Sequence, residues 1–281
     1  MPDDAGERHG ASIEAFLLHD RWIVLFALLS LSGLAWLYLI IMASRMAAGD
    51  MSMMGLGDLS GLADMQAMGA MDMSQMPWTV ATVVLMFVMW SVMMVGMMVP
   101  SATPMILLFA RVQRHKFADA APGLRISAFV VGYLLVWVSF SLIATGLQWL
   151  LTELRFLSPM MESTNSLLAS GILLGAGAYQ LSPLKQACLR RCQSPADFLA
   201  SHWQDGVNGS LRMGFEHGVF CLGCCWLLMT LLFVGGVMNL ILVAAIAFFV
   251  LLEKIAPRGE VVGKIGGGLL ACFAVYIILQ Q

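Results

Sequence analysis

The sequence predicts an all-α, polytopic helical transmembrane bundle of about seven spans with a cytoplasmic N-terminus. Three observations predict it. Of the 281 residues, 60% are apolar and only 11% are charged, which is not the composition of a soluble domain. The apolar residues form repeated runs of roughly 17 to 25, the length of a membrane-crossing helix, without the alternation of barrel strands. If the N-terminus is inside, only Arg45 and Arg155 of the 15 Lys and Arg residues lie outside, as the positive-inside rule requires.

The N-terminal part of the chain divides into a polar segment and one span. Residues 1–21 are polar and acidic, and they are expected to form a cytoplasmic segment. They do not resemble a secretory signal, because the leader is not basic and the apolar run after it is too long. The first transmembrane span is predicted over 22–43, followed by Arg45 at the outer interface.

Residues 44–77 are predicted to form an external loop rich in methionine. The loop is polar and of low complexity, and it holds nine methionines: Met46, Met51, Met53, Met54, Met65, Met68, Met71, Met73 and Met76. Thioethers are soft ligands that select copper(I), and they form no disulfides in an oxidising compartment. The clusters at 51–54 and at Met71, Met73 and Met76 therefore predict copper capture. The alternative is a flexible linker that has drifted in composition.

Residues 78–281 are predicted to form a transmembrane metal-handling core. Its apolar runs predict six further spans, over 78–100, 126–151, 166–181, 212–233, 240–252 and 262–279. Pro100 and Pro104 are expected to kink or break the first of these spans. The fourth and sixth of the seven runs are short, and full crossing is left open for both. The polar, basic loop 183–211 is expected to lie in the cytoplasm as one or two interfacial helices.

The stretch 212–226, R-M-G-F-E-H-G-V-F-C-L-G-C-C-W, is the main candidate for a metal site. At about 100° per residue, one helix face carries an imidazole and several sulfur side chains: Met213, His217, Cys221, Cys224 and Cys225. Soft ligands on a membrane helix favour copper(I) over zinc, although cysteines also pack as small apolar residues. Glu216 lies off this face, and it is a part of the metal site, a charge at the helix N-terminus or the partner of a basic side chain.

One straight helix cannot bring all these ligands to one ion. At about 1.5 Å rise per residue, His217 and Cys224 are about 10 Å apart along the axis. His217 with Cys221, and Cys221 with Cys224 or Cys225, are therefore expected to form separate half-sites. This spacing predicts a relay of weak sites with few ligands each, not one closed site.

Two further sets of residues are candidate ligands. Cys188 and Cys192 are four apart among basic residues that would favour thiolate, and metal hand-off at the cytoplasmic mouth competes with a packed pair that binds nothing. A methionine stripe at helical spacing, either ligands or ordinary core, runs along the second span: Met86, Met89, Met93 and Met97. Cys272 stands alone in the last span and is expected to pack.

Four motifs together resemble a known family. They are Q-L-S-P-L-K-Q-A-C-L-R-R-C at 180–192, the stretch 212–226, F-V-G-G-V-M-N-L at 233–240 and M-M-V-P-S-A-T-P-M at 97–105. Over roughly 78–279 the chain is similar to a bacterial family of predicted metal-binding integral membrane proteins, sometimes labelled copper chaperones. The resemblance implies that the motif residues are Cys188, Cys192, Glu216, His217, Cys221, Cys224 and Cys225.

The expected function is copper(I) handling in the plasma (inner) membrane. External methionines would capture the ion and intramembrane Cys, His and Met residues would receive it, for transport or for metallation of a copper enzyme. Besides the lipid bilayer, such an enzyme or a periplasmic copper carrier is the expected partner, and a homo-oligomer is possible. The absence of a basic patch with aromatics argues against nucleic acid.

Two other classes of function stay open at this point. The first is a membrane-bound metal-dependent oxidoreductase, or a subunit of one, with a compact catalytic site at Glu216, His217 and Cys221. The second, less favoured, is a thiol-redox membrane protein. No nucleophile, zinc-protease or phosphate-loop motif supports an enzyme, so a non-enzymatic role is preferred.

Overall fold

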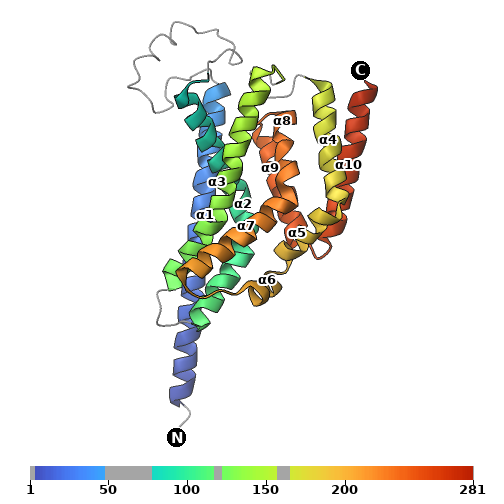
Figure 1. The fold of residues 1–281 in the computed structure, drawn as a ribbon. Helices are drawn as coiled ribbons and strands as arrows, with labels where there is room; N and C mark the ends of the chain where they lie inside the picture. The colour runs from blue at the N-terminus through green and yellow to red at the C-terminus, as the bar shows by residue number, and fades with distance from the viewer. Residues whose placement is uncertain (1–3, 48–77, 117–121, 157–164, 281) are drawn as a thin grey trace.

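All the regular structure in the described part of the chain is α-helical, which confirms the all-α class (Figure 1). The computed structural model describes residues 4–47, 78–116, 122–156 and 165–280. The helices are α1 (Asp4–Ala47), α2 (Val80–Lys116), α3 (Pro122–Glu153), α4 (Ser166–Leu181), α5 (Pro183–Gln193), α6 (Pro195–His202), α7 (Gly206–Thr230), α8 (Leu232–Gly235), α9 (Leu240–Ile255) and α10 (Gly259–Leu279).

The number of helices able to cross a membrane is lower than the seven predicted. Within the described residues five segments are long and apolar enough, namely Trp22–Arg45, Val80–Arg114, Pro122–Glu153, Gly206–Gly235 and Gly259–Leu279. A sixth is reached if α4 and α5, bent by 62° at their junction, count as one span. The predicted sixth run forms α9, which has 16 residues, whereas a crossing takes about 20. The cytoplasmic side of the N-terminus stays a prediction.

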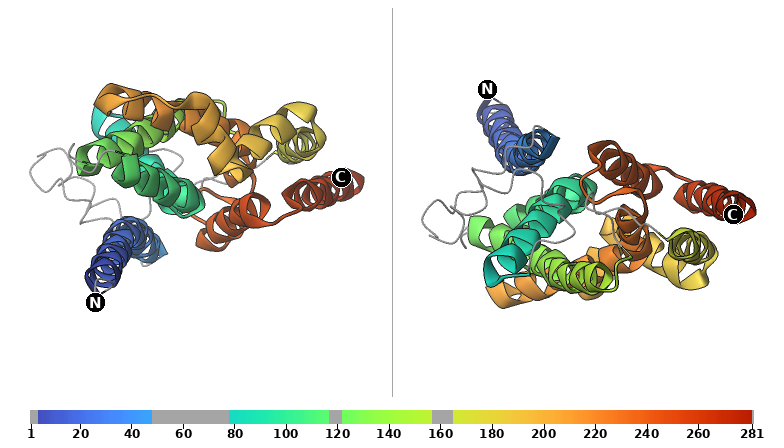
Figure 2. Two further views of the ribbon diagram at one scale, coloured as in Figure 1. Left: turned by 90° about the horizontal axis from the view of Figure 1, so that it is seen from below. Right: turned by 90° about the horizontal axis from the view of Figure 1, so that it is seen from above.

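The helices form an elongated bundle with α1 and α10 at its opposite edges (Figure 2). The most extensive helix contacts join α3 to α7, α4 to α10, and α1 to α2. The short helices α5 and α6 lie at the same end of the bundle as the N-terminus, and the end of α1 that leads to residue 48 lies at the other end (Figure 1). The two ends of the bundle therefore differ, and the short helices α5 and α6 belong to the end that has the N-terminus.

Of the two expected effects of the prolines, a kink or a break of the helix, the break does not occur in α2. The helix runs from Val80 to Lys116 with Pro100 and Pro104 inside it. Because Pro100 has no N–H, the carbonyl of Gly96 loses its partner in the helix. Ser32 Oγ and Trp36 Nε1 of α1 both donate to this carbonyl oxygen at 3.2 Å. A neighbouring helix thus satisfies the freed group, as is usual for prolines within membranes.

Glycines allow α3 and α7 to approach backbone to backbone. A Cβ atom at Gly132 would lie 2.1 Å from the carbonyl oxygen of Leu211, and one at Gly214 would lie 2.0 Å from that of Phe129. Small residues at a helix crossing are the usual means of close packing between membrane helices, where burial of apolar groups gives little gain. This crossing places α3 over the buried face of α7.

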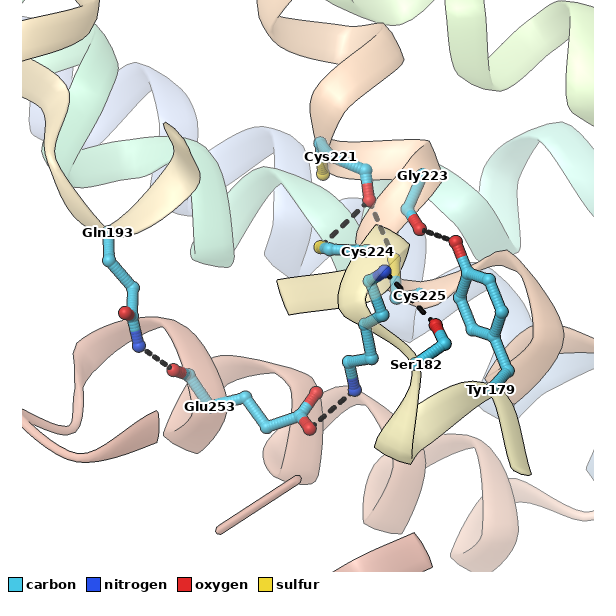
Figure 3. Close-up of polar contacts among 9 residues, drawn as sticks. Tyr179, Ser182, Gln193, Cys221, Gly223, Cys224, Cys225 and Glu253 are labelled. Atoms are coloured by element: carbon cyan, nitrogen blue, oxygen red, sulfur yellow. Dashed lines mark hydrogen bonds and ion pairs between the residues drawn. The ribbon is translucent and has the colours of Figure 1, made fainter. Parts of the chain in front are cut away.

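A buried ion pair holds the C-terminal third of the chain together. Lys185 Nζ of α5 lies 2.5 Å from Glu253 Oε1 of α9, and the two side chains are only 2% and 1% exposed. Gln193 of α5 donates to the backbone oxygen of Glu253 at 2.7 Å (Figure 3). A Cβ at Gly263 of α10 would lie 2.6 Å from the same carboxylate. The pair therefore fixes α5, α9 and α10 relative to one another.

Replacement of Gly214 by alanine is expected to destabilise the protein by at least about 1–3 kcal/mol, because the new methyl group meets a backbone oxygen that cannot move away. Gly146→Ala on α3 is the matched control, since nothing lies within 4 Å of a Cβ there and alanine favours helix. Thermal unfolding in detergent measures both. Equal stability of the two variants would contradict the close crossing.

Removal of one member of the buried ion pair is expected to lower the free energy of unfolding more than removal of both members. Lys185→Met leaves Glu253 buried without its cation, which costs roughly 3–5 kcal/mol in comparable pairs. Adding Glu253→Leu to this variant should restore most of the loss. Arg190→Met, which removes the exposed pair with Glu260, is the control and should unfold near the wild-type temperature. A double variant less stable than Lys185→Met would refute the pairing.

Candidate metal site

The predicted ligand face of α7 is buried along its whole length. Met213, His217, Cys221, Cys224 and Cys225 are all between 0% and 3% exposed, as expected for one helix face at 100° per residue. The helix begins at Gly206, six residues before the predicted span, because the polar residues after α6 already continue into it. The face therefore lies inside the bundle and away from lipid.

Cys221 is the most highly connected residue of this face. Its Sγ lies 2.9 Å from Lys254 Nζ of α9 and 3.1 Å from the Tyr133 hydroxyl of α3. Lys254 also donates to Ser101 Oγ of α2 at 2.9 Å, and Tyr133 donates to the backbone oxygen of Met98 at 3.1 Å. One thiol thus joins four helices through polar contacts within the core.

The next two thiols of α7 are aligned by the backbone of Cys221. The Sγ atoms of Cys224 and Cys225 both donate to the Cys221 carbonyl oxygen at 3.0 Å (Figure 3). The side chains of Cys221 and Cys225 also interact with each other. The thiols of Cys224 and Cys225 are therefore both held next to Cys221.

Cys188 and Cys192, for which metal hand-off and simple packing were both considered, lie against α7. The Cys192 side chain interacts with that of Cys224. Cys188 Sγ lies 2.8 Å from the position of a Cβ at Gly223, so the absence of a side chain there makes room for it. The Tyr179 hydroxyl donates to the Gly223 carbonyl beside this contact (Figure 3). Five of the six cysteines, all of them free thiols, thus gather where α5 meets α7.

The basic residues of α5 contact other groups than these thiols. Lys185 is paired with Glu253, and Arg190 Nε lies 2.5 Å from Glu260 Oε1. The Arg191 guanidinium lies 5.5 Å from the centroid of the Phe220 ring. These contacts do not support the expectation that the basic residues favour the thiolate forms of Cys188 and Cys192. The cation that contacts a thiol is Lys254, which the sequence did not indicate.

His217 and Glu216 have different surroundings. His217 lies among three rings, with centroids 5.4 Å from Phe198, 5.9 Å from Tyr133 and 6.2 Å from Phe129. Its Nδ1 atom is buried without a hydrogen bond. Glu216 instead accepts a hydrogen bond from Arg212 Nε at 3.0 Å. Glu216 is thus the partner of a basic side chain through Oε1, while its Oε2 is buried without a hydrogen-bond partner.

The methionine stripe of α2 lies in the core. Met86, Met89, Met93 and Met97 are 8% exposed or less. The Met86 sulfur accepts from Gln148 Nε2 at 3.6 Å, and Gln148 in turn accepts from Trp90 at 2.7 Å. The loop methionines Met71, Met73 and Met76 lie outside the described residues.

No three His, Cys, Asp or Glu side chains converge to hold an ion in the ranges that the structure describes. A compact catalytic site at Glu216, His217 and Cys221 is therefore not formed there, and neither is a closed tetrahedral zinc site, which needs four ligands. The donors that are present are pairs of soft sulfurs, and pairs of this kind suit copper(I).

Sequence reasoning missed Lys254, Glu253 and Tyr133. The two charged residues directly follow the predicted span 240–252, and the count of basic residues placed Lys254 on the cytoplasmic side. The length of that span could have indicated their burial. A helix of 16 residues is shorter than the membrane is thick, so if it starts at one membrane surface, charged residues at its end do not reach the opposite surface. Nothing in the sequence distinguishes Tyr133 from other tyrosines.

Comparison with known proteins gives one family. None of the curated proteins and none of the solved structures match the chain. A family model described as PpoB2, copper chaperone, matches residues 87–277, which is more than half of the chain. The matched region includes α5, α7, α9 and most of the α2 stripe. The chain therefore belongs to the PpoB2 copper chaperone family.

Proposed function

We propose that this protein carries copper(I) as cargo in its membrane-embedded helical core, held by successive pairs of thiols. The observation that supports this most strongly is the gathering of five free thiols from α5 and α7. Cys192 with Cys224 is one pair, and Cys221 with Cys225 is another. Thiolate sulfur is the ligand type that selects copper(I), and copper(I) is stable with two ligands.

The absence of a converging group of three ligands in the described residues supports passage over storage. An ion bound by only two sulfur ligands can bind a neighbouring sulfur before it releases one of the first two, because its coordination sphere is not full. Cys224 and Cys225 adjoin on α7 and both bond the Cys221 carbonyl. We infer that they connect the two thiol pairs.

The methionines supply the outer part of the proposed path. In this proposal the external loop captures copper(I) through Met71, Met73 and Met76, and the ion continues along the stripe Met86, Met89, Met93 and Met97. The stripe is supported by its continuous burial in α2 and by the chemistry of thioethers. His217, buried with an unpartnered Nδ1, is an additional ligand in this proposal.

The place and partners of the protein follow from the same proposal. The long apolar helices support a multi-pass protein of the plasma (inner) membrane, with the methionine-rich loop on the outer side. A copper-dependent enzyme or a periplasmic copper carrier is the proposed partner. The protein acts as a carrier and not as an enzyme.

Loss of one thiol pair is expected to weaken copper(I) binding strongly. In the Cys192→Ser/Cys224→Ser variant the affinity should fall by more than roughly 100-fold, since even residues that only orient a ligand change metal affinity by 10–100-fold. Competition with a coloured copper(I) chelator, on purified protein without oxygen, measures this. Cys272→Ser is the matched control, because this exposed cysteine stands apart on α10. Equal copper affinity in both variants would refute the thiol site.

The loop methionines are expected to affect capture and not the core. Met71→Ser, Met73→Ser and Met76→Ser together should slow copper loading at low external copper by about tenfold, because the soft ligands that collect the ion are gone. The equilibrium affinity of the detergent-purified core should stay at the wild-type value. Copper accumulation in cells and chelator competition give the two readouts. An unchanged loading rate would exclude this loop as the capture site.

A further inference from the structure

The described core contains one positive charge that no carboxylate balances. Three charged side chains are buried there, Lys185, Glu253 and Lys254. The first two neutralise each other at 2.5 Å. Lys254 instead contacts the neutral Ser101 hydroxyl and the Cys221 sulfur, each at 2.9 Å. Its charge is therefore directed at the thiols.

An isolated charge inside a membrane protein is costly, and such residues usually have a functional partner. A hydroxyl compensates only part of the cost of removing an ammonium group from water. The compensating anion must therefore come from the sulfur side of Lys254. Two thiolates that hold one copper(I) ion carry a net charge of −1, and Lys254 brings the total to zero.

The same count gives a different result for a divalent ion. Two thiolates with zinc(II) are neutral, so that Lys254 would leave a net charge of +1 in the core. Because net charge is poorly tolerated in a low dielectric, a fixed cation beside the thiol pair favours a monovalent metal over a divalent one. Lys185 cannot act in this way, since the Glu253 carboxylate already neutralises its charge.

We propose that Lys254 sets the selectivity of the thiol site for a monovalent soft metal ion, through its contact with Cys221. This proposal rests on the proposed function, because it assumes that the thiols bind copper. Lys254 is a positioning residue and not a ligand. Its ammonium group orients Cys221 together with Tyr133 and balances the charge of the occupied site.

The test compares copper(I) and zinc(II) affinities of Lys254→Leu with those of the wild type. Leucine removes the charge and, unlike methionine, adds no sulfur ligand beside Cys221. The copper(I) affinity should fall on the order of 100-fold, as expected for loss of a nearby unit charge in a partly screened interior, while the zinc(II) affinity stays equal or rises. Lys254→Arg should keep the wild-type ratio. Lys264→Leu, on an exposed part of α10, is the control for loss of a lysine.

The outcomes separate this proposal from the function on which it rests. If the wild type binds no copper(I), the proposed function fails. If the wild type binds copper(I) and Lys254→Leu has the same copper-to-zinc ratio, only the role of Lys254 is overturned. Should Lys254→Leu not fold, Lys254→Gln removes the charge and keeps a donor for Ser101. In the wild type, silver(I) should bind much more tightly than cadmium(II), and equal affinities would overturn the proposal without any variant.

Discussion

The ion pair between Lys185 and Glu253 is the interaction on which the arrangement of the thiols depends. Both side chains are almost fully buried, so each requires the other, and this requirement brings α5 against α9. Two consequences follow for α7. Helix α5 carries Cys188 and Cys192 onto the face where Cys224 lies. The residue after Glu253 points about 100° away, and Lys254 thereby reaches Cys221. Two adjacent residues of a short helix thus present opposite charges to different neighbours.

Close contact and polar groups, more than apolar burial, give this bundle its specific packing. Between helices in lipid, apolar surface gains little by association, so backbone approach and hydrogen bonds decide which faces meet. Gly132 and Gly214 bring α3 and α7 into backbone contact. The carbonyl of Gly96, freed by Pro100, receives two donors from α1. Pro100, which removes one hydrogen bond within α2, thus provides the carbonyl group to which α1 binds.

The donors in the core suit an ion that moves. Sulfur pairs select a soft ion, and a closed set of ligands would hold that ion too firmly for a carrier. The pairs Cys192–Cys224 and Cys221–Cys225 are linked through the Cys221 carbonyl, to which Cys224 and Cys225 both donate, and the Lys254 cation contacts Cys221 of the second pair. Membership of a copper chaperone family agrees with a site built for transfer, although the path itself is our proposal.

The sequence by itself determined the helical class, the main helices and the buried face of α7, because apolar run length and the 100° repeat are local properties of one chain segment. Its count of seven spans is not confirmed by the five to six candidate helices of the described residues, and it left open whether α2 is kinked or broken, since neither the bend between α4 and α5 nor the donors Ser32 and Trp36 can be read from spacing. Only the tertiary structure decided which helix covers each face. Spacing fixes the direction of a side chain about its own axis and contains no information about the neighbour. For that reason the sequence did not show that Cys188 and Cys192 lie against α7, or that Lys254, counted on the cytoplasmic side, contacts Cys221.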